Sequence, residues 1–153
     1  MRFEKTVRVQ ATPDELWRLV DDIEAVAGCI PGMSDFSPQG DREFSALMTQ
    51  RVGPVTARFR LNTRLTDLEP MRSVTAVSEG RDPDLDSSVR AEQRFEFRPV
   101  DGVTDVDISA DIRMTGRVAT FGQRIISSKA ERVVVDALAN VSTLLEGRRS
   151  RGG

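Results

Sequence analysis

Three neutral polar side chains, Gln50, Thr63 and Gln93, fall among apolar residues on one face of segments that alternate in hydrophobicity. An amide or hydroxyl on the buried face of a sheet is costly unless something forms a hydrogen bond with it. The backbone, an ordered water or the carbonyl of a ligand could each do so. These residues are therefore candidate polar contacts in a binding site whose remaining wall is apolar.

Acid–base and metal chemistry have few residues to use in this chain. It has no histidine and no tyrosine, and Cys29 is its only cysteine. Histidine is the commonest general base and metal ligand, and metal sites need clustered His, Cys or carboxylate groups. No carboxylate falls clearly in the inward register of the three longest predicted strands. We therefore expect a protein that is not an enzyme and has no metal or covalent cofactor.

The composition indicates one globular domain. Of the 153 residues, 39% are hydrophobic and 30% are charged, and the formal net charge is -2, which gives no electrostatic case for a nucleic-acid partner. A single cysteine cannot form an intrachain disulfide, as is usual in the cytosol. The sequence starts without the apolar core of a signal peptide, and no apolar run approaches the ~20 residues of a membrane-spanning helix. We expect a cytoplasmic protein.

The periodicity predicts one strand, two short helices and then further strands. Residues 2–10 alternate as a half-buried strand. Thr12, Pro13 and Glu15 form the start of a helix with a reciprocal capping pair, and Asp21 repeats the capping pattern for a second helix ending near Ala27. Two-residue alternation follows from Met33 onward. Together these segments predict an α+β fold with an antiparallel sheet of about six to seven strands.

The Asp101-Gly102 pair predicts the best-defined hairpin, because Asp-Gly favours two-residue turns. With Val100 opposite Val103, the apolar residues Phe97 and Val106 also meet. The same register places Phe95 opposite Ile108 and Arg98 beside Asp105. It also places Glu96 beside Asp107, a repulsive pair that the diagonal residues Arg94 and Arg98 could relieve.

Residues 117–147 predict a long amphipathic helix. Apolar residues recur at steps of three to five, which draws one stripe along it: Val118, Phe121, Ile125, Ala130, Val133, Ala137, Val141 and Leu144. Arg124, Lys129, Glu131, Arg132 and Asp136 fall mostly on the opposite, solvated face. Gly116 and Gly122 at its start would leave room between helix and sheet, since glycine otherwise costs about 1 kcal/mol inside a helix.

We therefore expect the sheet to curve around this helix and to leave an apolar cavity between them. An ordinary packed core is the alternative, and the pattern alone favours it; the two glycines and the inward polar residues are the features that favour a cavity. The residues expected to form the apolar wall are Phe44, Met48, Phe59, Leu61, Phe95, Phe97, Phe121 and Ile125.

Three stretches carry the motifs of a known family, in its order. They are Leu16-Trp17 followed by Cys29-Ile30-Pro31-Gly32, then Val52-Gly53-Pro54-Val55-Thr56-Ala57-Arg58-Phe59, then residues 116–126. With these motifs the chain resembles the CoxG family of carbon monoxide dehydrogenase proteins, within the START-like (SRPBCC) superfamily. The resemblance implies the helix-grip fold, a curved sheet wrapped around the C-terminal helix.

The resemblance also implies a function. Members of that family are non-catalytic accessory proteins beside molybdenum hydroxylases of the carbon monoxide dehydrogenase type, linked to membrane recruitment and to binding a lipophilic quinone. The ligand implied here is a menaquinone or ubiquinone head with part of its isoprenoid tail, or another lipid. Matched residue by residue, Ile30, Pro31 and Gly32 would form a turn at the cavity rim, and Phe121, Gly122 and Ile125 the helix wall. For Pro31 and Gly32 a turn that only shapes the loop is an equal alternative to ligand contact. Trp17 of the first motif is also expected to contact the ligand.

The chain is expected to divide into a START-like domain over residues 1–147 and a frayed basic tail over residues 148–153. Arg148, Arg149 and Arg151 of the tail could contact anionic lipid at about 1 kcal/mol each. Such a contact would place the protein peripherally at the inner face of the membrane.

Two other functions remain open on the sequence. An assembly or docking protein would present outward charges, although such charges also suit an ordinary solvated sheet face: Arg90, Glu92, Arg94, Glu96 and Arg98, with the acidic, mobile segment 82–86. START-like domains also include cyclases, dehydratases and hydrolase-like members. An enzyme of this kind would need Glu79, Asp67 or Cys29 to point inward with a shifted pKa.

Overall fold

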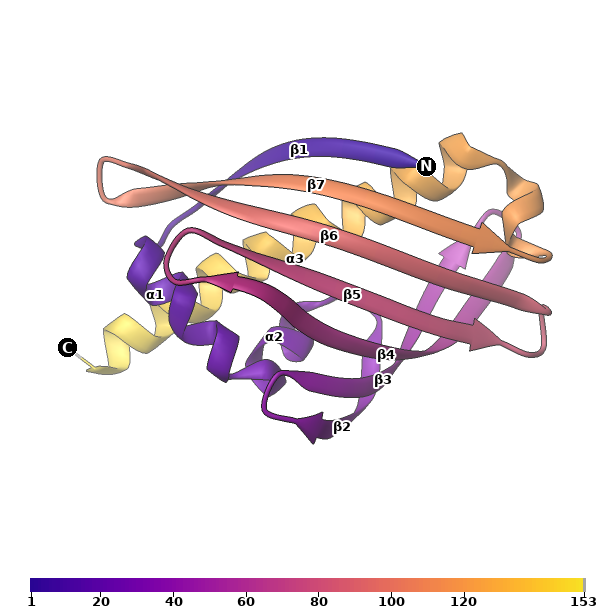
Figure 1. Ribbon diagram of the computed structural model, residues 1–153, viewed down its shortest axis with the longest axis horizontal. Coiled ribbons are helices and arrows are strands. Elements are labelled where there is room, and N and C mark those ends of the chain that lie inside the picture. Colours follow the sequence, from indigo (N-terminus) through magenta and orange to yellow (C-terminus); the bar gives the residue numbers. More distant parts are fainter. Residues whose placement is uncertain (153) are drawn as a thin grey trace.

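Seven antiparallel strands form one curved sheet, and a long helix runs along one face of it (Figure 1). The computed structural model describes residues 1–152. Two short helices and a 3-10 turn follow the first strand and lie at the end of the molecule where the long helix finishes. The elements are β1 (Arg2–Val9), α1 (Pro13–Trp17), η1 (Arg18–Asp21), α2 (Ile23–Cys29), β2 (Met33–Gly40), β3 (Glu43–Val52), β4 (Val55–Glu69), β5 (Ser73–Asp82), β6 (Ser87–Val100), β7 (Val103–Thr115), η2 (Val118–Phe121) and α3 (Gln123–Gly152). This is the expected α+β helix-grip fold.

The strand order is β1-β7-β6-β5-β4-β3-β2. From β2 to β7 every strand pairs with its neighbour in the sequence, as a meander. The exception is β1, which pairs with β7, so that Arg2 lies opposite Asp111 and Val9 opposite Thr104. The first and last strands in the sequence are therefore neighbours, and β1 and β2 form the two edges of the sheet.

The predicted β6–β7 hairpin is confirmed residue by residue. Val100 pairs with Val103, Phe97 with Val106 and Phe95 with Ile108. The turn residues Asp101 and Gly102 both have positive φ, 47° and 86°, as a tight hairpin with the twist of its strands requires.

The repulsive pair on this hairpin is relieved by the arginines expected to do so. Glu96 lies opposite Asp107. Arg98 donates to Asp107 through Nε (3.2 Å) and Nη2 (3.1 Å), and Arg94 Nε donates to Glu96 at 3.0 Å. Each carboxylate thus has its own guanidinium, and the Arg98 hydrogen bonds lower the pKa of Asp107.

The start of α1 is the predicted capping box. The Glu15 backbone N–H donates to Thr12 Oγ1 at 3.2 Å, and the Thr12 N–H donates to Glu15 Oε1 at 3.0 Å. The second helix is capped one residue later than expected. Asp22, rather than Asp21, accepts from the Ala25 N–H at 3.3 Å.

The long helix begins and ends later than predicted. Gly122 has a φ of 95°, which interrupts the helix, so η2 stands where the first turn was expected and α3 starts at Gln123. At the other end α3 continues to Gly152, so residues 148–152 are helical rather than frayed; Gly153 lies outside the described residues. Arg148 and Arg149 are fixed there by ion pairs with Asp22 and Glu15.

The acidic segment after Gly80 is an ordered turn, not a mobile loop. Asp82 ends β5 with 3% of its surface exposed. Its carboxylate accepts from the backbone N–H groups of Arg58 (2.8 Å), Asp84 (3.0 Å) and Leu85 (3.2 Å). The sequence pattern treats Asp82 as a surface charge, whereas its carboxylate ties β4 to the β5–β6 turn.

Two apolar clusters fix α3 to the sheet. Along its middle and C-terminal half, Val134, Val141 and Leu145 pack with Val9 and Val106. Near its N-terminus, Ile126 packs in a second cluster with β3, β4 and η2 residues: Val52, Ala57, Phe59, Leu61 and Val118. The helix is therefore packed on the sheet near its start and again along its middle and C-terminal half.

Candidate functional site

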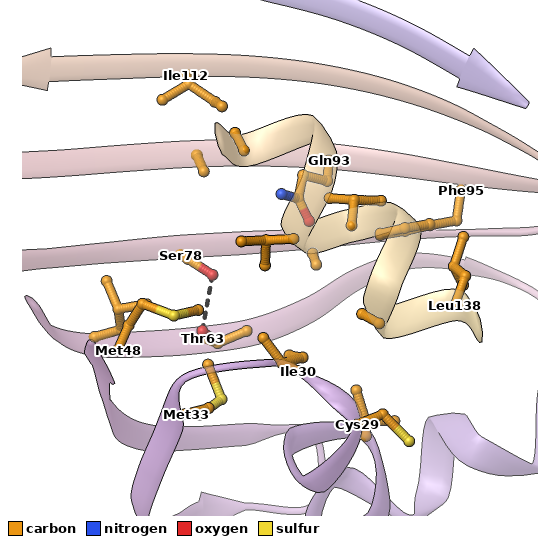
Figure 2. A pocket seen from close by; sticks show the side chains of 18 of the residues that line it. Cys29, Ile30, Met33, Met48, Thr63, Ser78, Gln93, Phe95, Ile112 and Leu138 are labelled. Atoms are coloured by element: carbon orange, nitrogen blue, oxygen red, sulfur yellow. Dashed lines mark hydrogen bonds between the residues drawn. The ribbon is translucent and has the colours of Figure 1, made fainter. Parts of the chain in front are cut away.

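A cavity of about 320 Å³ lies between α3 and the concave face of the sheet (Figure 2). Its wall combines side chains from β3 to β7 with others from α1, η1, α2 and α3. The volume lies at the lower end of the ~300–1,000 Å³ typical of small-molecule sites, whose walls are also mostly apolar. The interior is thus not completely filled by the protein's own side chains.

Ten of the residues nominated from the sequence line this cavity. Nine of them lie on strands, and Ile30 lies in the turn after α2. The strand residues were predictable because the two-residue period of a strand fixes which face each side chain takes. The ten are Ile30, Phe44, Met48, Gln50, Phe59, Leu61, Thr63, Gln93, Phe95 and Phe97. Their role as ligand contacts stays a prediction.

Trp17 and Pro31 lie just behind the cavity wall rather than in it. The Trp17 ring meets the Phe97 ring edge to face, with centroids 6.4 Å apart and an interplanar angle of 73°. The Pro31 carbonyl accepts a hydrogen bond from Gln50 Nε2 at 2.7 Å. Both residues therefore support cavity residues, Phe97 and Gln50, from outside.

Three residues expected in the helix wall, Phe121, Gly122 and Ile125, do not line this cavity. Phe121 packs beside Gly53 at the β3–β4 turn, with the second apolar cluster. Gly122 has an unobstructed Cβ position and does not line the cavity, and Ile125 is 45% exposed. The cause is the break at Gly122, which starts α3 in a new phase and turns Ile126, 4% exposed, inward instead.

The space in the cavity comes from alanines rather than from the nominated glycines. Ala130 and Ala137 of α3 and Ala76 and Ala91 of the sheet all line it. Their methyl side chains take less of this space than larger residues would, while Val134, between Ala130 and Ala137, packs in the first apolar cluster. In the sequence, the alanines on the inward faces of two strands and one helix could have indicated this space.

Of the three nominated polar residues, two are already hydrogen-bonded within the protein. Gln50 Nε2 donates to the Pro31 carbonyl and lies 3.2 Å from the Met48 sulfur, and the Thr63 and Ser78 hydroxyls are 2.8 Å apart (Figure 2). The Gln93 amide points into the cavity, and its side chain makes no hydrogen bond to any other group of residues 1–152. The amide donors and acceptor of Gln93 are therefore open to the cavity.

Charge is nearly absent from the wall. Lys129 is the one charged residue that lines the cavity in the described part of the chain, although the helical pattern had placed it on the solvated face. Cys29 also lines it, and burial raises the pKa of its thiol, which keeps the thiol protonated.

The carboxylates nominated for catalysis lie elsewhere. Glu79 forms ion pairs with Arg90 and Arg64, and neither it nor Asp67 lines the cavity. Within residues 1–152 there is no group of three His, Cys, Asp or Glu residues placed to hold a metal ion.

The outward charges of β6 are largely paired within the protein. Arg90 pairs with Glu79, Arg94 with Glu96, and Arg98 with Asp107. They form the ladder of an ordinary solvated sheet face, and Asp82 of the acidic segment is buried. A membrane-spanning helix is absent from the described residues: none is both long and apolar enough.

Comparison with known proteins gives one family match and many structural ones. The family described as the CoxG subunit of carbon monoxide dehydrogenase matches residues 6–146. No curated protein sequence matches the chain. A conserved protein from Geobacillus kaustophilus superposes with a TM-score of 0.86 at 19% identity, covering 96% of each chain.

Two further solved structures share the fold at low identity. The Zhui aromatase/cyclase from Streptomyces sp. R1128 has a TM-score of 0.67 at 16% identity, covering 97% of this chain and 94% of its own. Ara h 8.0201 has a TM-score of 0.67 at 11% identity, covering 96% and 98%. At such identities the likeness establishes the fold and leaves the function to the site.

Proposed function

Since the chain belongs to the CoxG family of carbon monoxide dehydrogenase proteins, we propose that it is a non-catalytic accessory protein that binds a quinone or another lipophilic molecule in the cavity beneath α3. Family and fold support a ligand-binding accessory role in general terms. In the finer proposal, the protein serves a molybdenum hydroxylase of the carbon monoxide dehydrogenase type and links it to the quinone pool of the membrane.

The observation that carries the binding proposal is the contrast between an apolar wall and one unoccupied amide. Phenylalanine, leucine and valine side chains surround the cavity, and the Gln93 amide points into it. A quinone matches this contrast, because its ring and isoprenoid tail are apolar and its carbonyl oxygens accept hydrogen bonds. The Gln93 side-chain N–H would donate to one of those oxygens, as specificity in such sites commonly rests on few polar groups.

The non-catalytic part of the proposal is supported by the composition of the wall. Acid–base catalysis needs a titratable group near the reacting atoms. The cavity offers a buried neutral thiol at Cys29 and an ammonium at Lys129, while Glu79 is held in outward ion pairs. We therefore propose that the protein holds its guest rather than transforming it.

Ala137→Phe tests the binding site, with Ala139→Phe as its matched control. Both alanines lie on α3, but Ala137 lines the cavity whereas Ala139 is exposed. The only tryptophan, Trp17, contacts the cavity residue Phe97, so a quinone that enters should quench its fluorescence. With a short-chain menaquinone or ubiquinone as the probe, we expect A137F to lose affinity by roughly tenfold or more and A139F to retain it. Equal quenching in both variants, each shown to be folded by circular dichroism, would contradict the site.

The link to a hydroxylase is tested separately, by affinity capture. Tagged protein should retain a molybdenum hydroxylase of the carbon monoxide dehydrogenase type from a lysate that contains one, and the A137F variant should do so equally if the cavity is not the docking surface. If the folded protein retains none of a purified hydroxylase of this type, the partner proposal is wrong and the cavity proposal is unaffected.

A further inference from the structure

Lys129 is an unusual residue for its position. Only two of the 22 basic residues of the chain are lysines. Lys5 lies on β1 and pairs with Glu131 at 3.1 Å. Lys129 lines the apolar cavity, is half-buried, and makes no ion pair with any residue in the described range 1–152.

The surroundings of Lys129 offer it no negative partner. On α3, side chains three and four residues apart are neighbours, and for Lys129 these positions hold isoleucine, arginine and valine: Ile125, Ile126, Arg132 and Val133. Across the cavity, the wall formed by residues 1–152 carries no carboxylate. No carboxylate of the described residues therefore competes with solvent or a guest for the three donors of the Lys129 side chain.

The half-buried side chain also fixes where the charge lies. The methylene stem of a lysine packs along apolar surface while its ammonium reaches toward water. Ile126, Ala130 and Val133, neighbours of Lys129 on α3, line the same cavity. The ammonium consequently lies where the apolar wall meets solvent, and a guest with its chain inside would bring its head group to this place.

We propose that the cavity takes amphiphiles with an acidic head, of the fatty-acid type, and that Lys129 pairs with their carboxylate while the apolar wall holds the alkyl chain. This inference rests on the proposed binding function and adds a second class of guest to the neutral quinone. A charge-assisted hydrogen bond between ammonium and carboxylate is stronger than the one a neutral hydroxyl or carbonyl would accept.

Dodecanoate and dodecanol test the assignment, because they share a twelve-carbon chain and differ in the charge of the head. Binding is followed by Trp17 fluorescence, or by displacement of a fluorescent lipid probe, at neutral pH and low salt, below micelle-forming concentrations. The wild type should bind dodecanoate more tightly than dodecanol by about three- to tenfold, and added salt should reduce the difference. Lys129→Gln should remove the preference by weakening dodecanoate binding more than dodecanol binding, whereas Lys129→Arg should retain it.

Arg132→Gln is the matched control, since Arg132 lies three residues away on α3, is exposed and does not line the cavity. It should behave as the wild type. If wild type and Lys129→Gln prefer dodecanoate equally, or if the wild type has no preference, the role of Lys129 is refuted while dodecanol or quinone binding still supports the cavity. If dodecanoate, dodecanol and short-chain quinones all fail to bind, the proposed function itself fails.

Discussion

Both carboxylate oxygens of Glu15 accept hydrogen bonds from Nη1 of Arg149, at 2.8 and 2.7 Å. Arg149 Nη2 also donates to the Gln10 carbonyl at 2.8 Å, and Arg148 Nη2 donates to Asp22 at 2.7 Å. The last turns of α3 are therefore attached to the N-termini of both short helices, α1 and α2 (Figure 1). These contacts hold the α1–α2 segment across one end of the cavity.

Removing the charge of Glu15 should make stability less dependent on acid pH. The Thr12 N–H and then Arg149 lower the pKa of Glu15 below its usual 4.5. A lowered folded-state pKa adds stability that is present above the unfolded value and is lost as pH falls through the folded value. Glu15→Gln, which keeps the capping hydrogen bond, should cost about 0.5–1 kcal/mol at neutral pH and nothing at a pH below both pKa values. Urea unfolding across the acid range measures the difference; Arg151→Gln, at the exposed end of the same helix, should follow the wild-type curve.

Two adjacent isoleucines of α3 test the phase of the helix. Ile126 is 4% exposed in the second apolar cluster, whereas Ile125 is 45% exposed. Ile126→Ala should lower the free energy of unfolding by about 2–4 kcal/mol, and Ile125→Ala by less than about 1 kcal/mol. Chemical denaturation measures both losses. The apolar stripe predicted from the sequence contains Ile125 and not Ile126, so it predicts the larger loss for Ile125→Ala.

Gly102 and Gly116 separate backbone strain from steric conflict. Both have a φ of 86°, but a Cβ on Gly102 would meet nothing within 4 Å, whereas one on Gly116 would collide with the Asp86 carbonyl and lie 2.7 Å from Ser87 Cα. Gly102→Ala should therefore lower the free energy of unfolding only by the cost of holding alanine in a left-handed backbone conformation, about 1–2 kcal/mol. Gly116→Ala should cost at least about 2 kcal/mol more. The melting temperatures of the two variants measure the difference. Similar values would contradict the prediction and would mean that the β5–β6 turn shifts to make room for the new methyl group.

Loss of the Asp82 carboxylate should destabilise the β5–β6 turn. Three backbone N–H groups donate to it in a site that is almost closed to solvent. Leaving such donors unpaired costs about 1–3 kcal/mol, so Asp82→Ala should lower stability by this amount. Asp84→Ala is the control, because Asp84 is exposed and contributes only its backbone N–H to the turn. Hydrogen exchange at the Arg58, Asp84 and Leu85 amides should accelerate only in the Asp82 variant.

The strand-borne half of the site could be predicted because alternation leaves only two choices for each side chain. Once Phe95 and Phe97 were placed inward, the Asp101-Gly102 turn fixed their partners, and the observed register agrees. The same reasoning placed Gln93 on the cavity face, where it lies. Local turn chemistry and the hydrophobic pattern agreed there, and such agreement is what makes a prediction reliable.

The helix-borne half could not be predicted, because a helical stripe depends on where the helix starts. The spacing of Val118, Phe121 and Ile125 continues formally across Gly122, and nothing in that spacing reveals the positive φ that breaks the chain there. A shift in phase then exchanged Ile125 for Ile126 and moved Lys129 from the solvated face to the cavity wall. Asp82 was missed for a related reason: only the fold shows that three backbone amides converge on it.

The pairing of β1 with β7 has a consequence for synthesis of the chain. Arg2 finds its partner only when Asp111 has left the ribosome, and the Met1 ammonium donates to the Ile112 carbonyl at 2.9 Å. The strands β2 to β7 can pair one hairpin at a time during translation, whereas β1 can pair only after β7 has been synthesised, through a contact between residues far apart in the sequence. A bulky fusion at the N-terminus would therefore act on the final step of folding, and would leave β7 as a bare edge on an otherwise finished sheet.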